Sequence, residues 1–237
     1  MVEPPPRFAE IKIPLPEPVH GLDAVTGVLG IPRWWPTGSR VSVVISHGAG
    51  RDMDDPIIEH LHTELTERRC LTLRFNHPFA EAKKRRPDPV RVLRRTMRAA
   101  VGILSSDPTA APAHLFVGGK GLGGQVAADL AGSRVRVDGA FFLGYPLHAS
   151  GKSETVQAEQ LYRLIAPMLF IQGTRDRTCD IDVLRQTLTR VGAPTTLQVC
   201  QEADQHFKVL KKSQRTEEEV REEVLNGVDG WITRILE

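Results

Sequence analysis

A glycine-rich stretch in the middle of the chain has the spacing of a turn that presents a nucleophile. An apolar run ending at Val117 leads into the residues GGKGLGG (118–124), and an alanine-rich run follows. A strand, a tight glycine turn and a helix in this order expose the central residue of G-x-S-x-G at the start of the helix. Gly119 and Gly123 fill the two glycine positions, but Gly121 stands where the serine would be. The sequence therefore predicts the turn without its nucleophile.

An aspartate and a histidine follow this turn in an order that suits acid–base chemistry. Asp176 leaves the apolar run Met168–Gln172, and His206 lies beyond the last apolar run before the C-terminal helix. A nucleophile position, an aspartate and a histidine in this order are typical of one kind of catalytic triad. Either residue alone would be an ordinary loop residue. Their placement after the expected strands favours a paired role.

The same glycines also spell G-x-G-x-x-G, which binds a dinucleotide pyrophosphate when it opens the first βαβ unit. Here the turn lies in mid-chain, and Asp138 comes only 14 residues after Gly124, whereas the acidic residue of that motif lies about 20 positions on. His60 and His62 are two apart, so they face different sides of a helix and do not have metal-ligand spacing. We therefore expect neither a cofactor nor a metal.

Alternating strands and helices must hold these residues. Short continuous apolar runs bounded by glycine, proline or polar residues are typical of strands buried on both faces. They occur at Val41–Ser46, Leu71–Phe75, His114–Val117, Gly139–Leu143, Met168–Gln172 and Thr195–Val199. Amphipathic helical patterns lie between most of them, around residues 56–65, 90–104, 125–131 and 181–191, and a last one follows Thr216. This alternation predicts a mostly parallel α/β sheet with helices on both faces and ligands at the carboxyl ends of the strands.

The first 38 residues differ from the rest, because they hold eight of the 17 prolines. Proline excludes helix over most of this stretch but is tolerated in an edge strand. The runs Phe8–Ile13 and Ala24–Ile31 are therefore expected to pair as an antiparallel hairpin at a sheet edge. We expect no second domain there, and we place one α/β domain over residues 39–237.

Composition narrows the function classes. The chain has 237 residues, with 41% hydrophobic and 25% charged residues and a net charge of +2, so neither wholesale disorder nor bulk attraction to nucleic acid or membrane is expected. Three cysteines without a C-x-x-C pair fit a reducing compartment. No run reaches 18 apolar residues, and the start MVEPPPRF has no signal-peptide pattern. We expect a cytoplasmic protein without a membrane partner.

One local basic patch departs from this balance. Lys83-Lys84-Arg85-Arg86 is followed by four arginines on one helical face, namely Arg91, Arg94, Arg95 and Arg98. A solvated helix face is the favoured interpretation. The alternative is a surface over residues 83–98 that binds an acidic protein partner. Nucleic acid is disfavoured, because no aromatic residues interleave with the basic ones.

Five ordered segments together resemble a known family. The segments are SHGAGRDMD, GGKGLGG, YPLH, IQGTRD and ADQHFKV, and the resemblance covers about residues 40 to 236. They resemble the small, nearly lidless α/β-hydrolases of the dienelactone-hydrolase-like branch. That branch includes mammalian testis-expressed proteins and a subunit of a histone acetyltransferase complex.

The resemblance implies an α/β-hydrolase fold and assigns roles to individual residues. Asp176 would orient His206, which would be the general base, and the N–H groups of Ala49 and Leu122 would form an oxyanion hole. The chain departs from the family at Gly121, which has no side chain to acylate. The remaining predicted pocket residues are His47, Gly48, Lys120 and Tyr145. Of these, we expect His47 to be a positioning residue.

The resulting functional hypothesis is an ester- or acyl-hydrolase relative that is inactive or weakly active. Natural loss of the nucleophile and an introduced Ser→Gly change both fit the sequence, and so does slow hydrolysis through a water activated by His206. A relocated nucleophile at Thr178 or Cys179 is a disfavoured alternative, because neither lies on the turn. The segment Tyr145–Ala166 is too short for a large lid, so we expect a shallow, open site for a small ester or acyl ligand.

Overall fold

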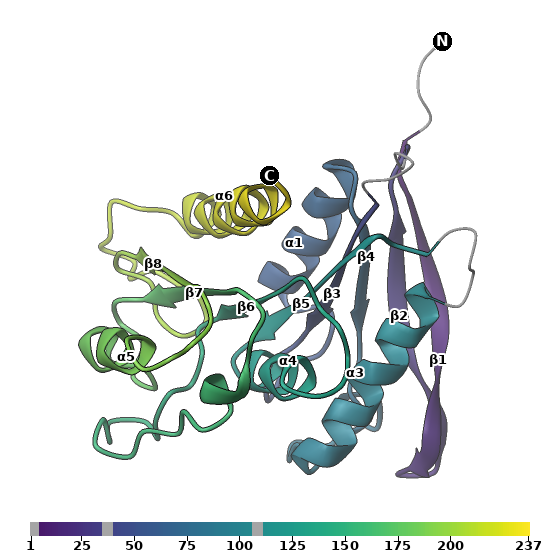
Figure 1. Cartoon of the computed structure of the whole chain (residues 1–237), viewed down its shortest axis with the longest axis horizontal. Coiled ribbons are helices and arrows are strands. Elements are labelled where there is room, and N and C mark those ends of the chain that lie inside the picture. The colour runs from purple at the N-terminus through teal and green to yellow at the C-terminus, as the bar shows by residue number, and fades with distance from the viewer. Residues whose placement is uncertain (1–4, 35–39, 106–110) are drawn as a thin grey trace.

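Eight strands form one sheet in the computed structural model, which describes residues 5–34, 40–105 and 111–237. The strands are β1 (Arg7–Val19), β2 (Leu22–Ile31), β3 (Val41–Ser46), β4 (Leu71–Phe75), β5 (His114–Lys120), β6 (Gly139–Leu143), β7 (Met168–Gly173) and β8 (Thr195–Cys200). They lie in the order β1-β2-β4-β3-β5-β6-β7-β8 (Figure 1). Strands β3 to β8 are parallel to their neighbours among themselves, and β2 pairs antiparallel with both β1 and β4. The predicted mostly parallel sheet is confirmed.

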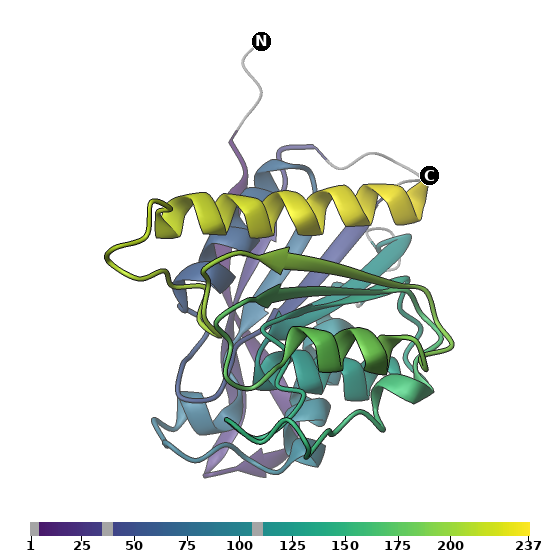
Figure 2. The same cartoon turned by 90° about the vertical axis from the view of Figure 1, so that its left-hand side faces the viewer.

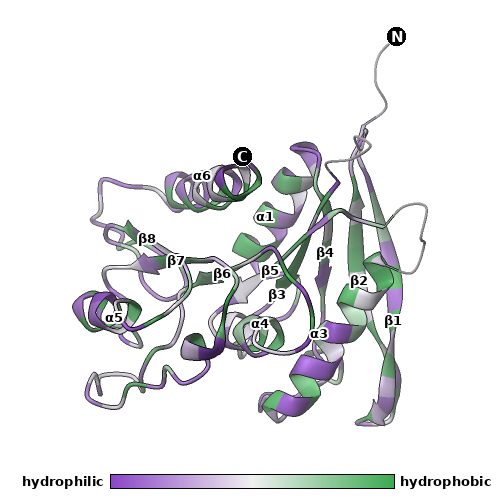
Figure 3. Cartoon of the chain, viewed as in Figure 1, coloured by the Kyte–Doolittle hydropathy of each residue, from purple (hydrophilic) through white to green (hydrophobic). Residues whose placement is uncertain are grey.

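Helices cover both faces of the sheet and divide the core in two. The helices are α1 (Pro56–Glu67), α2 (Pro78–Glu81), α3 (Val90–Leu104), α4 (Leu122–Ala131), α5 (Ile181–Leu188) and α6 (Glu217–Leu236). Helices α1 and α6 lie on one face, and α3, α4 and α5 lie on the other (Figures 1 and 2). The central strands are largely hydrophobic, whereas α3 and α6 carry hydrophilic and hydrophobic residues around the helix (Figure 3). Burial of both sheet faces explains why these strands are continuous apolar runs.

Helix ends follow the capping residues that the sequence contains. The Asp55 side chain accepts from the N–H of Ile57 at the start of α1, and Thr216 and Glu219 form a reciprocal capping box at the start of α6. Two boundaries differ from the prediction. Helix α4 begins at Leu122 rather than at residue 125, because the positive φ of the preceding glycine ends the strand there. Helix α5 ends at Leu188, short of residue 191, where Gly192 and then a proline follow.

The N-terminal segment forms an edge hairpin of the same sheet. Strands β1 and β2 pair antiparallel and are joined by a turn at His20-Gly21, and β2 continues the sheet onto β4. The outer strand β1 carries Pro14, Pro16 and Pro18. Proline is suited to this position because it cannot donate to a further strand.

The carboxyl ends of β3, β5, β7 and β8 meet at one edge of the sheet, as parallel strands require. The loop after β3 carries Ala49, and the turn after β5 is Gly121. The loops after β7 and β8 carry Asp176 and His206. Between β6 and β7 the described chain contains only a three-residue 3₁₀ turn, Leu161–Arg163, so the expected absence of a large lid is confirmed.

Candidate functional site

The turn after β5 has the strained backbone that a nucleophile position requires. Gly121 has φ +53° and ψ −117°, and its N–H donates to the carbonyl of Leu143 at 2.9 Å. Its own carbonyl accepts from the N–H groups of Gly124 and Gln125, which starts α4. This φ favours glycine, because a Cβ would be strained there. A Cβ at residue 121 would nevertheless meet no heavy atom within 4 Å, so the position opens onto free space.

The flanking glycines let β5 and α4 approach the neighbouring strand. A Cβ on Gly119 would lie 2.5 Å from the carbonyl oxygen of Ser46, and one on Gly123 would lie 2.3 Å from the same oxygen. No side chain fits at these distances from a backbone atom. The spacing of the glycines therefore follows from the close packing of the turn against the end of β3.

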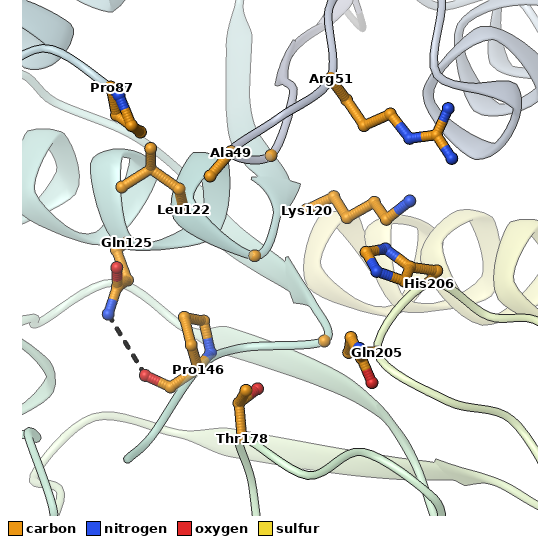
Figure 4. Close-up of a pocket in the computed structure, with 13 residues that line it drawn as sticks. Ala49, Arg51, Pro87, Lys120, Leu122, Gln125, Pro146, Thr178, Gln205 and His206 are labelled. Carbon is orange, nitrogen blue, oxygen red and sulfur yellow. Dashed lines mark hydrogen bonds between the residues drawn. The ribbon is translucent and has the colours of Figure 1, made fainter. Parts of the chain in front are cut away.

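A cavity of about 350 Å³ lies in front of this turn (Figure 4). Its lining combines small and apolar groups with a few polar and cationic side chains, as small-molecule sites usually do. The lining residues are Gly48, Ala49, Arg51, Pro87, Lys120, Gly121, Leu122, Gln125, Gly144, Pro146, Thr178, Gln205 and His206. Neither Ala49 nor Leu122 donates its N–H to another described residue, so both donors are available to a ligand.

Two predicted pocket residues, His47 and Tyr145, are buried and do not line the cavity. Nδ1–H of His47 donates to the carbonyl of Gly48 at 2.9 Å, and Nε2 accepts from the N–H of His77 at 3.0 Å. Burial lowers the pKa of His47, which fits this neutral ring. His47 thus fixes the turn beside Ala49, in agreement with a positioning role.

Tyr145 is part of the core below the cavity. Its ring packs against Phe142 and Phe170, with centroid distances of 5.4 and 5.8 Å. Burial raises the pKa of its hydroxyl. The ring was predicted to lie in the pocket. It packs instead into the core on the α3, α4 and α5 side of the sheet, where aromatic contacts stabilise it.

The Asp176 carboxylate accepts three hydrogen bonds from its own loop and strand. Oδ1 accepts from the N–H and the hydroxyl of Thr178, both at 2.7 Å, and Oδ2 accepts from Nε2 of Gln172 at 2.5 Å. Burial raises the pKa of Asp176, while these hydrogen bonds act in the opposite direction. Among the described residues, the carboxylate makes no hydrogen bond to His206. The structure therefore does not join the two residues that the sequence paired.

His206 lies at the cavity, in a different electrostatic environment. The side chain is exposed, and Figure 4 shows its ring beside the end of Lys120. Partial desolvation and then the positive charge of Lys120 lower the pKa of His206, while Asp204 and Asp55 oppose the shift. A lowered pKa leaves the ring neutral at pH 7. His206 can thus offer one donor and one acceptor to a ligand.

A buried ion pair adjoins the turn and was not predicted. Lys120 Nζ donates to Asp55 Oδ2 at 2.7 Å, and the two side chains are only 6% and 2% exposed. Desolvation lowers the pKa of Lys120, and Asp55 opposes that shift. Arg51 lies 3.9 Å from the same carboxylate oxygen. Two features of the sequence point to this pair. One is the single lysine within the run of glycines, and the other is the aspartate expected at the N-terminus of the first helix.

Neither of the two alternative nucleophiles, Thr178 and Cys179, has the environment of an activated one. The Cys179 thiol is buried, and burial raises its pKa, which disfavours the reactive thiolate. Thr178 lines the cavity but lies on the loop after β7 and not on the turn after β5. Its hydroxyl proton is donated to Asp176 rather than to an imidazole.

Much of the basic patch on α3 is paired on the surface. Arg94 lies 3.2 Å from Asp129, Arg95 pairs with Glu17 at 2.5 Å, and Arg98 donates to Ser133 Oγ at 3.3 Å. These partners belong to a solvated helix face of the kind expected from the sequence.

Metal-binding clusters and membrane-spanning helices are both absent from residues 5–34, 40–105 and 111–237. No group of three or more histidine, cysteine or acidic side chains there could hold a metal ion. No helix in the same ranges combines the length and apolar character needed to cross a bilayer.

Comparison with known proteins gives the class. A family model described as an alpha/beta hydrolase domain matches residues 39–233, and the chain therefore belongs to this α/β-hydrolase family. The sheet order and the helices on both faces are those of the α/β-hydrolase fold.

Solved structures of lidless and dienelactone-hydrolase-like proteins are similar to the chain. A dienelactone hydrolase from Anabaena variabilis has a TM-score of 0.70 at 18% identity, over 95% of this chain and 98% of that one. A putative α/β hydrolase of unknown function from Agrobacterium tumefaciens has a TM-score of 0.74 at 17% identity, over 95% and 97%. An α/β serine hydrolase without a lid from Xanthomonas campestris has a TM-score of 0.69 at 17% identity, over 94% of both. At these identities the likeness concerns the fold.

Proposed function

We propose that this α/β-hydrolase-family protein binds a small ester- or acyl-type ligand in the cavity at Gly121 without forming an acyl-enzyme there. The observation that carries the proposal is the combination of an intact turn and free space at residue 121. The backbone has the conformation that aims a nucleophile, the cavity lies in front of it, and residue 121 has no side chain. A covalent acyl route needs an oxygen or sulfur nucleophile at the reacting position.

The environments of His206 and Asp176 support the proposal that the protein is inactive or only weakly active as a hydrolase. A general base needs hydrogen-bond reach to its proton and, in a triad, a partner that orients it. His206 is exposed and has no hydrogen bond to Asp176 in the described chain. Loss of the nucleophile alone lowers kcat by about a million-fold in a triad protease, and an unoriented imidazole recovers little of that. Slow attack by a water beside His206 is the residual chemistry that remains open to this site.

A fluorophosphonate probe and p-nitrophenyl butyrate hydrolysis test the proposal. We expect no labelling of the wild-type chain and no hydrolysis above the rate in buffer. Gly121→Ser should fold, since the added side chain has space, at a strain cost of about 1–3 kcal/mol. Gly121→Ala is the matched control, because it carries the same strain without a hydroxyl.

The Gly121→Ser variant then distinguishes two causes of inactivity, namely the missing nucleophile and the unoriented imidazole of His206. We expect it to react with the probe slowly at most, since His206 is not oriented by Asp176. Labelling of the wild-type chain, or a wild-type kcat/KM of about 10⁴ M⁻¹s⁻¹ or more, in the range of ordinary enzymes, would overturn the proposal.

The exposed basic side chains that lack ion-pair partners favour a second candidate function. In this function the protein is an interaction module that binds an acidic partner over residues 83–98. Lys83, Arg85, Arg86 and Arg91 are exposed and have no ion-pair partner among the described residues. Loss of partner capture from Arg91→Gln together with Arg86→Gln, with the fold intact, is the result expected of this function. Unchanged capture would exclude it.

A further inference from the structure

The charged residues of the cavity are gathered at one end. Arg51, Lys120 and His206 lie together on one side in Figure 4, and Pro87, Leu122 and Pro146 lie on the other. The same three polar residues also line a second, adjoining cavity of about 200 Å³. They therefore stand at the junction of two hollows, where a ligand in the first cavity would place its polar end.

Cationic side chains dominate the lining at this end of the cavity. The lining of the first cavity contains Arg51 and Lys120 and no aspartate or glutamate. Asp55, which lines the second cavity, is shared between the Lys120 ammonium at 2.7 Å and the Arg51 guanidinium at 3.9 Å. The negative charge of Asp204 acts on Lys120 and His206. Both carboxylates lie outside the lining of the first cavity, so a ligand there meets the cationic side chains and the imidazole directly.

The donors at this end suit a carboxylate. Arg51 is half exposed, so its guanidinium can turn from Asp55 toward a ligand and donate two hydrogen bonds in the planar fork that matches a carboxylate. Lys120 Nζ has protons beyond the one given to Asp55, and His206 offers one N–H. The two oxygens of one carboxylate can accept hydrogen bonds from all three of these groups.

From this arrangement we infer that the ligand is a small organic carboxylate, with its charged end at Arg51, Lys120 and His206 and its apolar part against Leu122 and Pro146. The inference rests on the proposed function, because it names the class of ligand that the same cavity would hold. Such a molecule is what ester hydrolysis releases, which suits a site that retains binding without the nucleophile. The partly desolvated position strengthens a charge-assisted contact relative to one on the open surface.

Binding of phenylacetate and phenylacetamide, measured by calorimetry on the full chain, tests the inference. The two probes have nearly the same shape and differ in charge. We expect phenylacetate to bind at least about ten-fold more tightly, which corresponds to about 1.4 kcal/mol, and its affinity to fall as salt rises. Arg51→Gln should remove most of this preference, because it should weaken phenylacetate binding more than phenylacetamide binding.

The matched control is Arg190→Gln, which removes an exposed arginine beyond the end of α5, at the opposite edge of the sheet. It should leave the preference intact. Equal affinities for the two probes, or a preference that survives Arg51→Gln, would overturn this inference while leaving the proposed ligand-binding function standing. Absence of binding by both probes would count against the proposed function and this inference together.

Discussion

The two halves of the site differ in what holds them. On one side, the turn at Gly121 and the loop at Ala49 are fixed by backbone contacts, namely the close approach of Gly119 and Gly123 to β3 and the bond from Gly121 to β6. On the other side, Asp176 bonds only within its own loop and strand, and His206 is exposed beside Lys120. Main-chain contacts thus fix the backbone half. In the side-chain half, no hydrogen bond joins Asp176 to His206 among the described residues.

This difference shows that packing can hold the turn independently of any chemistry at residue 121. The glycine turn is required for β5 to lead into α4 against β3, so packing alone maintains it. An aspartate–histidine pair contributes to catalysis, and little in the core depends on it. A buried ion pair between Lys120 and Asp55 adds a side-chain contact to the backbone half, because it joins the turn to the cap of α1 beyond the Ala49 loop.

Breaking this ion pair should have the largest effect. Lys120→Met leaves Asp55 buried without its cation, which should lower the free energy of unfolding by about 3–5 kcal/mol, as measured by urea denaturation. Lys120→Met combined with Asp55→Asn should recover most of the loss, since the amide oxygen can still cap α1. A single-variant loss below about 1 kcal/mol, the range of exposed pairs, would show that the pair does not hold the turn to the start of α1.

One added methyl group should disrupt the packing of the backbone half and lower the stability of the protein. Gly123→Ala places a Cβ 2.3 Å from the Ser46 carbonyl, so α4 or β3 must shift, and we expect a loss of about 3 kcal/mol. Gly102→Ala is the control, because its Cβ meets no atom within 4 Å, and it should stabilise α3 by about 1 kcal/mol. Thermal unfolding of both variants measures the difference. Equal effects would contradict the packing argument.

Substitutions in the side-chain half should have the smallest effect, and the quantity measured is the pKa of His206. Asp176→Asn should leave the pKa of His206 unchanged in an NMR titration, because no hydrogen bond joins the carboxylate to the ring among the described residues and Asp176 is not a cause of the pKa shift of His206. Lys120→Met should raise that pKa toward 6.5, since it removes the positive charge that helps to lower it. If Asp176→Asn instead lowered the pKa of His206 by about one unit, the two would form the coupled pair that the sequence predicted.

Several features of the site could be predicted because they depend on short-range sterics. The glycine spacing fixed the turn, and the apolar runs fixed which strand ends meet there. The start of α4 was placed three residues late, since Leu122, Gly123 and Gly124 have no helical periodicity of their own. Arg51, Gln205 and Pro87 were missed as lining residues, because nothing in their local sequence indicates a cavity.

The sequence by itself determined the sheet, the turn at Gly121 and the absence of a nucleophile on it, because each depends on residue types and spacing along the chain. Only the tertiary structure decided where the charges lie. Asp176 is held by Gln172 and Thr178, while His206 faces Lys120. Hydrogen bonds and ion pairs act over a few ångströms, so side-chain directions settle them, and order along the chain does not fix those directions.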